Sequence, residues 1–266
     1  MEQSRKYNLV RDARTDHPVH VFGAPRGALA TKIDLRSKCP SVYDQGSLGS
    51  CTANAIGAAY EFDQINHHTQ VTSHAFHPSR LFIYYNERAT EKTLLDDSGA
   101  AIEDGVKSVS TQGVCPEAIW PYDIKKFTIK PSIAAYAYAK TCHVTKFKKL
   151  NQDVTQLKTC LISGFPIILG MTVYESMESD DTAKTGMVPM PVYKEKCLGG
   201  HAVLIVGYDD TIIYDKKTGA KGVFIIRNSW GDSWGDKGYF FLPQPYVLDA
   251  NLCSDFWVLL NITRDL

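Results

Sequence analysis

The chain has 266 residues, of which 44% are hydrophobic and 22% are charged, so it can bury a sizeable core and is not expected to be disordered or fibrous. Lysine plus arginine equal aspartate plus glutamate at 29 each, and this balance gives no sign of attraction to nucleic acid or to an anionic membrane. The longest apolar runs, such as Phe165 to Leu169, are strand-sized and shorter than the roughly 18 to 20 residues of a membrane-spanning helix. We therefore expect a soluble protein, most simply a monomer, with a protein or small molecule as its partner.

The first 30 residues differ from the rest of the chain. Residues 1 to 12 are polar and lack the apolar core of a secretory signal, so the protein is expected to stay in the cytoplasm or to leave by an export route that the sequence does not reveal. Residues 1 to 30 show no sustained periodicity, which predicts an extension laid over the domain or a flexible arm. The globular part is expected to begin near Ile33.

Cysteine and histidine spacing argues against a metal site. The seven cysteines are too few for a disulfide-dense scaffold, and their odd number leaves at least one thiol unpaired within the chain. No C-x-x-C pair occurs, which removes the zinc-ribbon and thioredoxin interpretations. Four histidines gather in one segment without a ligand-spaced cysteine or carboxylate pair, and we interpret them as a solvated loop: His67, His68, His74 and His77. We expect no metal and no cofactor.

The first half of the chain is predicted to be mainly helical. A Gly/Ser loop at residues 44 to 50 runs straight into a helix that begins at Cys51. Pro78 favours the first turn of a second helix, and a third is expected over residues 102 to 110. Another helix is expected from a cap at Asn151 to residue 164.

The second half is predicted to be β-rich, because short β-branched and aromatic runs replace the helical pattern there. The expected strands cover residues 167–173, 202–207, 223–227, 239–242 and 256–262. The fold class is therefore α+β, with an extension at residues 1–30, a helical lobe at 31–148 and an antiparallel, β-rich lobe at 149–266. Two such lobes leave a cleft between them, which is a common place for a ligand site.

Cys51 is a candidate nucleophile because of its place at the start of a helix. Unpaired N–H groups and aligned peptide dipoles at a helix amino terminus favour the thiolate, which is the reactive form of cysteine. The small residues Gly49 and Ser50 keep its surroundings open, and Gln45 could donate its side-chain amide to a developing oxyanion. Taken alone, a buried cysteine is more often structural than catalytic.

Two later segments carry a candidate histidine and a candidate asparagine. His201 follows Gly199 and Gly200 at the start of an apolar strand, where a histidine is more often a surface or capping group than a catalyst. Asn228 ends another expected strand and precedes a glycine-rich turn that contains Trp230, and buried tryptophans usually serve packing. Neither segment by itself identifies a function.

Together the three segments resemble the papain family of cysteine peptidases, in the family's order along the chain. The nucleophile block is Gln45-Gly46-Ser47-Leu48-Gly49-Ser50-Cys51, and the histidine block is Gly200-His201-Ala202-Val203. The third and most specific block is Asn228-Ser229-Trp230-Gly231-x-x-Trp234-Gly235-x-x-Gly238-Tyr239. The spacing from Cys51 to Asn228 is longer than usual, which is consistent with a polar hairpin insertion at residues 209 to 221.

The resemblance implies a two-lobed fold and a peptidase mechanism. In it, a Cys51 thiolate and a His201 imidazolium form an ion pair, Cys51 attacks the peptide carbonyl, and His201 protonates the leaving amine before it activates water. Asn228 accepts a hydrogen bond from the other ring nitrogen of the histidine, Gln45 assists the oxyanion, and Trp230 shields the contact from water.

The resemblance also implies where a peptide substrate binds. Gly99 corresponds to the glycine that bonds the backbone of an extended peptide in this family. Gly199 and Gly200 form part of the wall of a specificity pocket, which is expected to be roomy and uncharged on that side. The identity of the preferred substrate, and endo- versus exopeptidase action, are left open.

Departures from the family pattern set further expectations. Leu48 and Thr52 stand where the family usually has a cysteine and a tryptophan, so the usual disulfide beside the active site is absent. Cys197 and Cys253 lie where the family often forms another disulfide, and the alternative for them is two buried, reduced thiols. The chain resembles the bacterial and viral branch, in which short extensions lie along the cleft, so residues 1 to 30 either restrain the peptidase or form an inert arm.

Two functions of other classes remain open beside the peptidase. One is a catalytically inactive protein that keeps the cleft and binds peptides. The other is a cysteine-dependent acyltransferase that delivers the acyl group to an amine instead of water. The chemically competent residues at positions 45, 51, 201 and 228 argue against the first, and the Asn-Ser-Trp-Gly block argues against the second.

Overall fold

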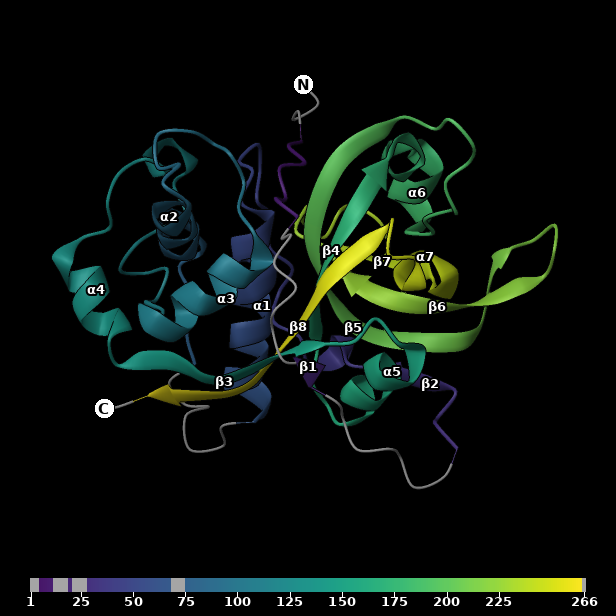
Figure 1. Ribbon diagram of the computed structural model, residues 1–266, viewed down its shortest axis with the longest axis horizontal. Coiled ribbons are helices and arrows are strands. Elements are labelled where there is room, and N and C mark those ends of the chain that lie inside the picture. Colours follow the sequence, from purple (N-terminus) through teal and green to yellow (C-terminus); the bar gives the residue numbers. More distant parts are fainter. Residues whose placement is uncertain (1–4, 12–18, 21–27, 68–74, 265–266) are drawn as a thin grey trace.

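The computed structural model describes residues 5–11, 19–20, 28–67 and 75–264. The helices of the first half of the chain gather on one side of the molecule, and most of the sheet lies on the other side together with the later helices, which confirms the α+β prediction (Figure 1). The helices of the described residues are α1 (Cys51–Asn66), α2 (Arg80–Glu91), α3 (Ile102–Thr111), α4 (Ile133–Ala139), α5 (Val154–Ile162), α6 (Asp180–Thr185) and α7 (Gln244–Leu248). The strands are β1 (Val19–His20), β2 (Lys32–Asp34), β3 (Cys142–Leu150), β4 (Ile167–Tyr174), β5 (Cys197–Asp215), β6 (Ala220–Arg227), β7 (Tyr239–Pro243) and β8 (Cys253–Arg264).

Helix α1 is the central helix of the molecule. Fourteen of its 16 residues are buried, because alanines and other small or apolar side chains occupy all of its faces. Helices α2 and α3 pack against it from one side, and strands β5 and β8 pack against it from the other (Figure 1). The amino terminus of α1 therefore lies where the helical side of the molecule meets the sheet.

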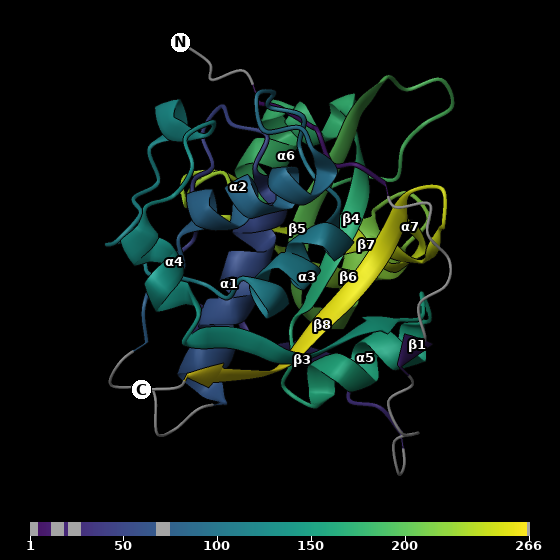
Figure 2. The same ribbon diagram turned by 60° about the vertical axis from the view of Figure 1, so that its left-hand side comes forward.

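The strands form one sheet in the order β1-β3-β8-β4-β5-β6-β7, with β2 paired to β5. All pairs are antiparallel except β1 with β3. Both ribbon views show β8 crossing from β4 toward β3, which lies beside the helices (Figure 1 and Figure 2). Strand β5 packs against α1, and its residue Ala202 lies beside Cys51, the first residue of that helix.

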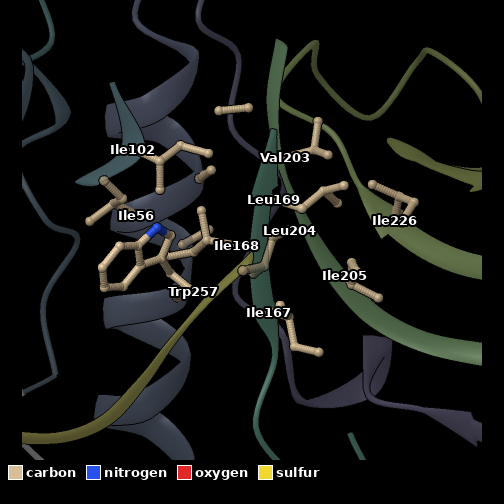
Figure 3. Packing of buried hydrophobic residues seen from close by; sticks show 14 of the residues in the cluster. Ile56, Ile102, Ile167, Ile168, Leu169, Val203, Leu204, Ile205, Ile226 and Trp257 are labelled. Carbon is tan, nitrogen blue, oxygen red and sulfur yellow. The ribbon is translucent and has the colours of Figure 1, made fainter. Parts of the chain in front are cut away.

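The sheet buries apolar side chains on both faces. Ile168 of β4 lies on the face that meets Ile56 of α1 and Trp257 of β8 (Figure 3). Side chains of neighbouring residues in a strand point to opposite faces, so Ile167, and with it Ile205 opposite in β5, lies on the other face. This two-sided core fixes β4 and β5 in register and thereby fixes the start of β5.

Two predicted helix starts are corrected by the structure. Ser79 caps α2 by accepting a hydrogen bond from the Phe82 N–H, so Pro78 precedes the cap instead of occupying the first turn. Helix α5 begins after Asp153, whose carboxylate accepts from the Gln156 N–H, and the predicted cap at Asn151 is wrong. In both cases a cap residue closer to the first helical turn satisfies the free N–H groups.

The predicted strands are all present, and the predicted insertion is the β5–β6 hairpin, in which Asp215 pairs with Ala220. Strand β5 is longer than predicted because it continues through polar residues into this hairpin. Strand β3 was missed, since exposed and half-buried lysines interrupt its apolar pattern. It spans the predicted lobe boundary at residues 148 and 149, and the boundary itself stays a prediction.

The disulfide hypothesis for Cys197 and Cys253 is not supported, because both are free thiols, one exposed and one buried. They lie on opposite sides of β4, across from Tyr174 and Met171. With strands about 4.8 Å apart, two positions that flank a third strand are roughly 10 Å apart. A disulfide needs Cα atoms within about 7 Å, so this geometry does not allow the bond.

Part of the predicted histidine loop lies outside the described residues, namely His68 and His74. His67 Nδ1 lies within hydrogen-bond distance of the Asp63 carboxylate, and His77 Nδ1 lies within hydrogen-bond distance of the Glu61 carboxylate. Among the described residues no group of three or more histidine, cysteine or acidic side chains is arranged to hold a metal ion. In the same residues, no helix has the length and apolarity that crossing a bilayer requires.

Candidate active site

Cys51 is the first residue of α1 and is fully buried. Burial raises the pKa of its thiol to about 12, because an anion is poorly stabilised away from water. The backbone N–H of Ala202 acts in the opposite direction, which places the sulfur beside the residue that follows His201. The turn from loop to helix and the start of β5 thus bring the predicted nucleophile to the predicted histidine segment.

His201 is also fully buried, and its ring is held by Asn228. The distance from His201 Nε2 to Asn228 Oδ1 is 2.9 Å. The Ser229 N–H donates to the same Oδ1 at 2.9 Å, which identifies that atom as the amide oxygen. Because an amide oxygen only accepts, Nε2 carries the proton and donates it. Nδ1 of the neutral ring is then the unprotonated nitrogen, and it has no hydrogen-bond partner among the described residues.

The surroundings of His201 keep the imidazole neutral in this structure. Burial lowers the pKa of His201 to about 4, the hydrogen bond to Asn228 opposes that shift, and the charge of Arg5 adds to it. With the thiol pKa of Cys51 raised at the same time, both groups are uncharged near neutral pH. The structure therefore shows a neutral Cys51 thiol and a neutral His201 imidazole, before any proton has passed from the thiol to the ring.

Gln45 lies in the loop before α1 and is buried. Its side-chain Nε2 donates to the Leu48 carbonyl at 3.0 Å, and its Oε1 accepts from the Ser229 hydroxyl at 2.6 Å. These bonds tie the nucleophile loop to the segment that carries Asn228. Since an amide nitrogen has two N–H groups, one remains for an incoming oxygen.

Residues 5–11 form a strap that lies along the site, between the helical side and β5 (Figure 1). The Leu9 N–H donates to the Gly200 carbonyl at 3.1 Å, and the Gly200 N–H donates to the Tyr7 carbonyl at 3.2 Å. On the opposite side, the Val10 N–H donates to the Ala100 carbonyl at 3.1 Å. The strap therefore bonds both walls of the site through its backbone.

Three glycines of the site allow the strap backbone to approach closely, because they have no side chains. A Cβ atom built on Gly99 would lie 1.7 Å from the Asn8 carbonyl oxygen, and one on Gly199 would lie 2.4 Å from the Tyr7 carbonyl oxygen. A Cβ on Gly200 would lie 3.0 Å from atoms of Leu9. All three predicted substrate-binding glycines thus lie against the backbone of the strap, which occupies the space in front of them; this space is called the channel below.

The strap also places side chains on the site. Arg5 forms an ion pair with Glu178 at 2.5 Å, and its guanidinium lies 4.2 Å from the centre of the Trp230 ring. Lys6 forms an ion pair with Asp97 at 2.6 Å. Charged contacts on both walls hold the strap in addition to its backbone bonds.

Tyr7 covers the imidazole. Its ring meets the rings of His201 and Trp230 edge to face, each at 6.1 Å between centres, and Trp230 stacks on His201 at 5.1 Å. The Tyr7 hydroxyl is buried and has no hydrogen-bond partner among the described residues. These aromatic rings exclude water from the histidine.

The structure brings all the predicted site residues to one region, and the roles assigned to them stay predictions. They are Cys51, His201, Asn228 and Gln45 for catalysis, and Gly99, Gly199, Gly200 and Trp230 for substrate binding.

A family model described as "Papain family cysteine protease" matches residues 29–246, which is most of the chain. The chain belongs to the papain family of cysteine proteases. It is 38% identical to xylellain, a cysteine protease from Xylella fastidiosa, with a TM-score of 0.84 over the full length of both chains. The papain-like fold and the assignment as a cysteine peptidase are thereby confirmed.

Relatives in sequence include a viral protein. An uncharacterized peptidase C1-like protein of Acanthamoeba polyphaga mimivirus is 47% identical over 240 residues, covering 87% of this chain and 73% of the relative. Ananain from Ananas comosus is 25% identical over 229 residues, covering 80% of this chain and 55% of ananain. The chain thus spans little more than half the length of some curated members of the papain family.

Several residues of the site were missed from the sequence. Tyr7 and Leu9 belong to the segment predicted either to restrain the peptidase along the cleft or to form an inert arm, but neither residue was singled out, although an aromatic and apolar cluster within a charged arm was a signal for docking. Asp97 directly precedes the glycine segment, and its contacts depend on the tertiary fold. The pair of Thr52 and Glu87 joins two helices, so local sequence gives no sign of it.

Glu87 lies fully buried behind the nucleophile. Its Oε2 accepts from the Thr52 hydroxyl at 2.7 Å, and its Oε1 has no hydrogen-bond partner among the described residues. Burial raises the pKa of Glu87 to about 8, the nearby acids Glu91 and Asp104 add to the shift, and the hydrogen bond from Thr52 and the charge of Arg88 oppose it. Where the papain family usually has a tryptophan beside its nucleophile, this chain has a threonine bonded to a protonated acid.

Glu87→Gln is expected to stabilise the protein at alkaline pH. The folded-state pKa lies above the usual value, so the stability that the neutral acid contributes is present below about pH 4.5 and is lost as pH rises through about 8. Glutamine keeps the acceptor for Thr52 and does not ionise. At pH 9 the variant's free energy of unfolding should exceed that of the parent by about 2–4 kcal/mol, whereas at pH 5 the two should agree.

Urea unfolding at both pH values measures this difference. Glu175→Gln, at an exposed glutamate, is the matched control and should show no such pH-dependent gain. Equal stability of the parent and Glu87→Gln at pH 9 would show that Glu87 is not held neutral by the fold.

Proposed function

We propose that the chain hydrolyses peptide bonds with Cys51 as nucleophile and His201 as its proton partner. The observation that carries the proposal is the hydrogen bond from His201 Nε2 to Asn228, since it leaves Nδ1 as the proton acceptor beside the start of α1. The Cys51 thiol transfers its proton to Nδ1, and the resulting thiolate is stabilised by the amino terminus of α1.

The thiolate then attacks the peptide carbonyl carbon and forms a tetrahedral intermediate. The Cys51 N–H and the free N–H of the Gln45 amide stabilise its oxyanion. The imidazolium gives its proton to the leaving amine, and an acyl-enzyme remains on Cys51. His201 next takes a proton from water, which attacks the thioester and releases the acid.

We further propose that the strap restrains this activity. A peptide substrate needs the channel along Gly99 and Gly200, and the strap's backbone fills that channel. The strap also keeps Cys51 and His201 away from water, and burial disfavours the charged pair that reacts. Opening the strap would therefore admit substrate and permit ionisation in one step.

Labelling by a peptide epoxide tests the proposal. The reagent carries a short peptide into the channel and alkylates the activated thiolate, so the protein should gain one reagent mass at Cys51. The label should be lost in Cys51→Ala and retained in Cys197→Ala, which removes an exposed thiol away from the α1 terminus. Labelling that followed Cys197, or that was indifferent to Cys51, would overturn the assignment of the nucleophile.

Product analysis separates hydrolysis from acyl transfer. With a fluorogenic peptide, the proposed enzyme should release the free acid whether or not an amine is added. Accumulation of the amide in place of the acid at low amine concentration would identify an acyltransferase, and the absence of both labelling and turnover would identify a peptide-binding protein.

A further inference from the structure

The nucleophile loop, residues 46–50, meets the glycine segment, residues 98–101, without a covalent link. Leu48 is buried in the apolar core, and the cysteines of the described residues are all free. Asp97 lies between the two segments, and its side chain is only 10% exposed. A mostly buried carboxylate must be paired or hydrogen-bonded to persist there.

The Asp97 carboxylate bonds both segments. The Gly49 N–H donates to Oδ1 at 3.0 Å and to Oδ2 at 3.1 Å. The Tyr84 hydroxyl donates to Oδ1 at 2.6 Å and in turn accepts from the Gly99 N–H at 3.1 Å. One carboxylate therefore connects the residue two before the nucleophile with the glycine that faces the channel.

The geometry around Gly49 is specific for this contact. A Cβ atom on Gly49 would lie 3.1 Å from Asp97 Oδ1 and 3.0 Å from the Asn8 side-chain nitrogen, so a larger residue would push both away. Lys6 and Asn8 of the strap also bond Asp97, through its carboxylate and its carbonyl. The strap thus binds to Asp97, the same residue that links the nucleophile loop to the glycine segment.

We propose that Asp97 is a positioning residue that holds the nucleophile loop and the glycine segment in register with each other. It touches no reacting atom. It fixes the position of the backbone that leads into Cys51 and the position of the Gly99 backbone beside the channel. Substrate alignment depends on both positions. Charged hydrogen bonds of this kind are about twice as strong as neutral ones, which suits a link between two loops.

The test compares Asp97→Asn with two controls in the full-length chain. Asp96→Asn makes the same change at an exposed neighbour whose side chain forms no hydrogen bond or ion pair among the described residues, and Lys6→Gln removes only the ion pair from the strap. Hydrogen exchange of residues 46–50 and 98–101 should become about tenfold faster in Asp97→Asn, the change that follows from losing a charged hydrogen bond. Neither control should accelerate exchange in both segments.

Tyr84→Phe provides a second, milder variant. It removes the bonds of the hydroxyl to Asp97 and Gly99 but leaves the bond between Asp97 and Gly49. Exchange should accelerate in residues 98–101 and remain near the parent rate in residues 46–50. This pattern distinguishes a link between two segments from a general loss of stability, which would accelerate exchange in both.

Kinetics form the second arm, which rests on the proposed peptidase function. Relative to Lys6→Gln, Asp97→Asn should show about tenfold lower kcat/KM for a short peptide, with KM raised because Gly99 is displaced. Exchange in Asp97→Asn equal to that in Asp96→Asn, or equal to that in Lys6→Gln, would overturn the proposal. Absence of turnover in every variant and the parent would overturn the proposed function instead, and the exchange result would still decide the role of Asp97.

Discussion

His201→Ala is expected to lower kcat/KM for peptide hydrolysis by about four to six orders of magnitude. Without the imidazole, no group accepts the Cys51 proton and none protonates the leaving amine, so both halves of the reaction lose their acid–base partner. A fluorogenic peptide assay measures the loss. Asn228→Ala should cost less, because the ring remains and only its orientation and tautomer are released.

His143→Ala is the matched control for the loss of a histidine. That ring is half-buried on β3 and bonds the Ser110 and Lys140 carbonyls, so its removal should leave kcat/KM within about twofold of the parent. An unchanged rate in His201→Ala would refute the assigned pair. An equal loss in both variants would indicate general destabilisation.

Leu9→Ala is expected to speed epoxide labelling of Cys51 about 30-fold. The Leu9 side chain is 9% exposed and packs against Gly170 and Gly200. Burying a leucine side chain contributes roughly 2 kcal/mol, and removing that contribution shifts the closed strap toward the open state by about this factor. The measurement is the rate of mass gain at Cys51 with the reagent well below saturation.

Val10→Ala tests whether the faster labelling of Leu9→Ala results from loss of the buried Leu9 side chain. Val10 is 43% exposed, and its hydrogen bond to Ala100 runs through the backbone, so labelling should stay near the parent rate. Removal of residues 1 to 30 should exceed the effect of Leu9→Ala. If all three proteins were labelled as slowly as the parent, the strap would be an inert arm.

Much of the site was predictable because its functional residues lie in short sequence segments with distinctive neighbours. A Gly/Ser loop before a helix places Cys51 at an amino terminus, and the glycines before His201 mark a backbone that approaches another chain segment. The Asn-Ser-Trp-Gly block contains both Asn228, which bonds the His201 imidazole, and Trp230, whose ring stacks on it. Each block alone left a structural interpretation open, and the predictions came from the three blocks together, through their resemblance to the papain family.

The missed features depend on segments that meet only in the folded chain. Asp97 and Gly49 are 48 residues apart, and Thr52 and Glu87 are 35 residues apart. A carboxylate in a loop or on a helix has the same local pattern whether it is solvated or buried. The helix caps Ser79 and Asp153 were misplaced for a simpler reason, since several polar residues near each start were able to cap it.

The central position of β8 has a consequence for how the enzyme is made. Among the described elements β8 leaves the ribosome last, yet it fills the gap between β3 and β4 in the middle of the sheet. Until it arrives, β4 presents an unpaired edge next to the strand that carries His201. Residues 5–11 precede β8 in the chain and are synthesised before it. If the strap restrains the peptidase as proposed, the restraining segment is therefore already present when β8 completes the sheet beside the proposed catalytic residues.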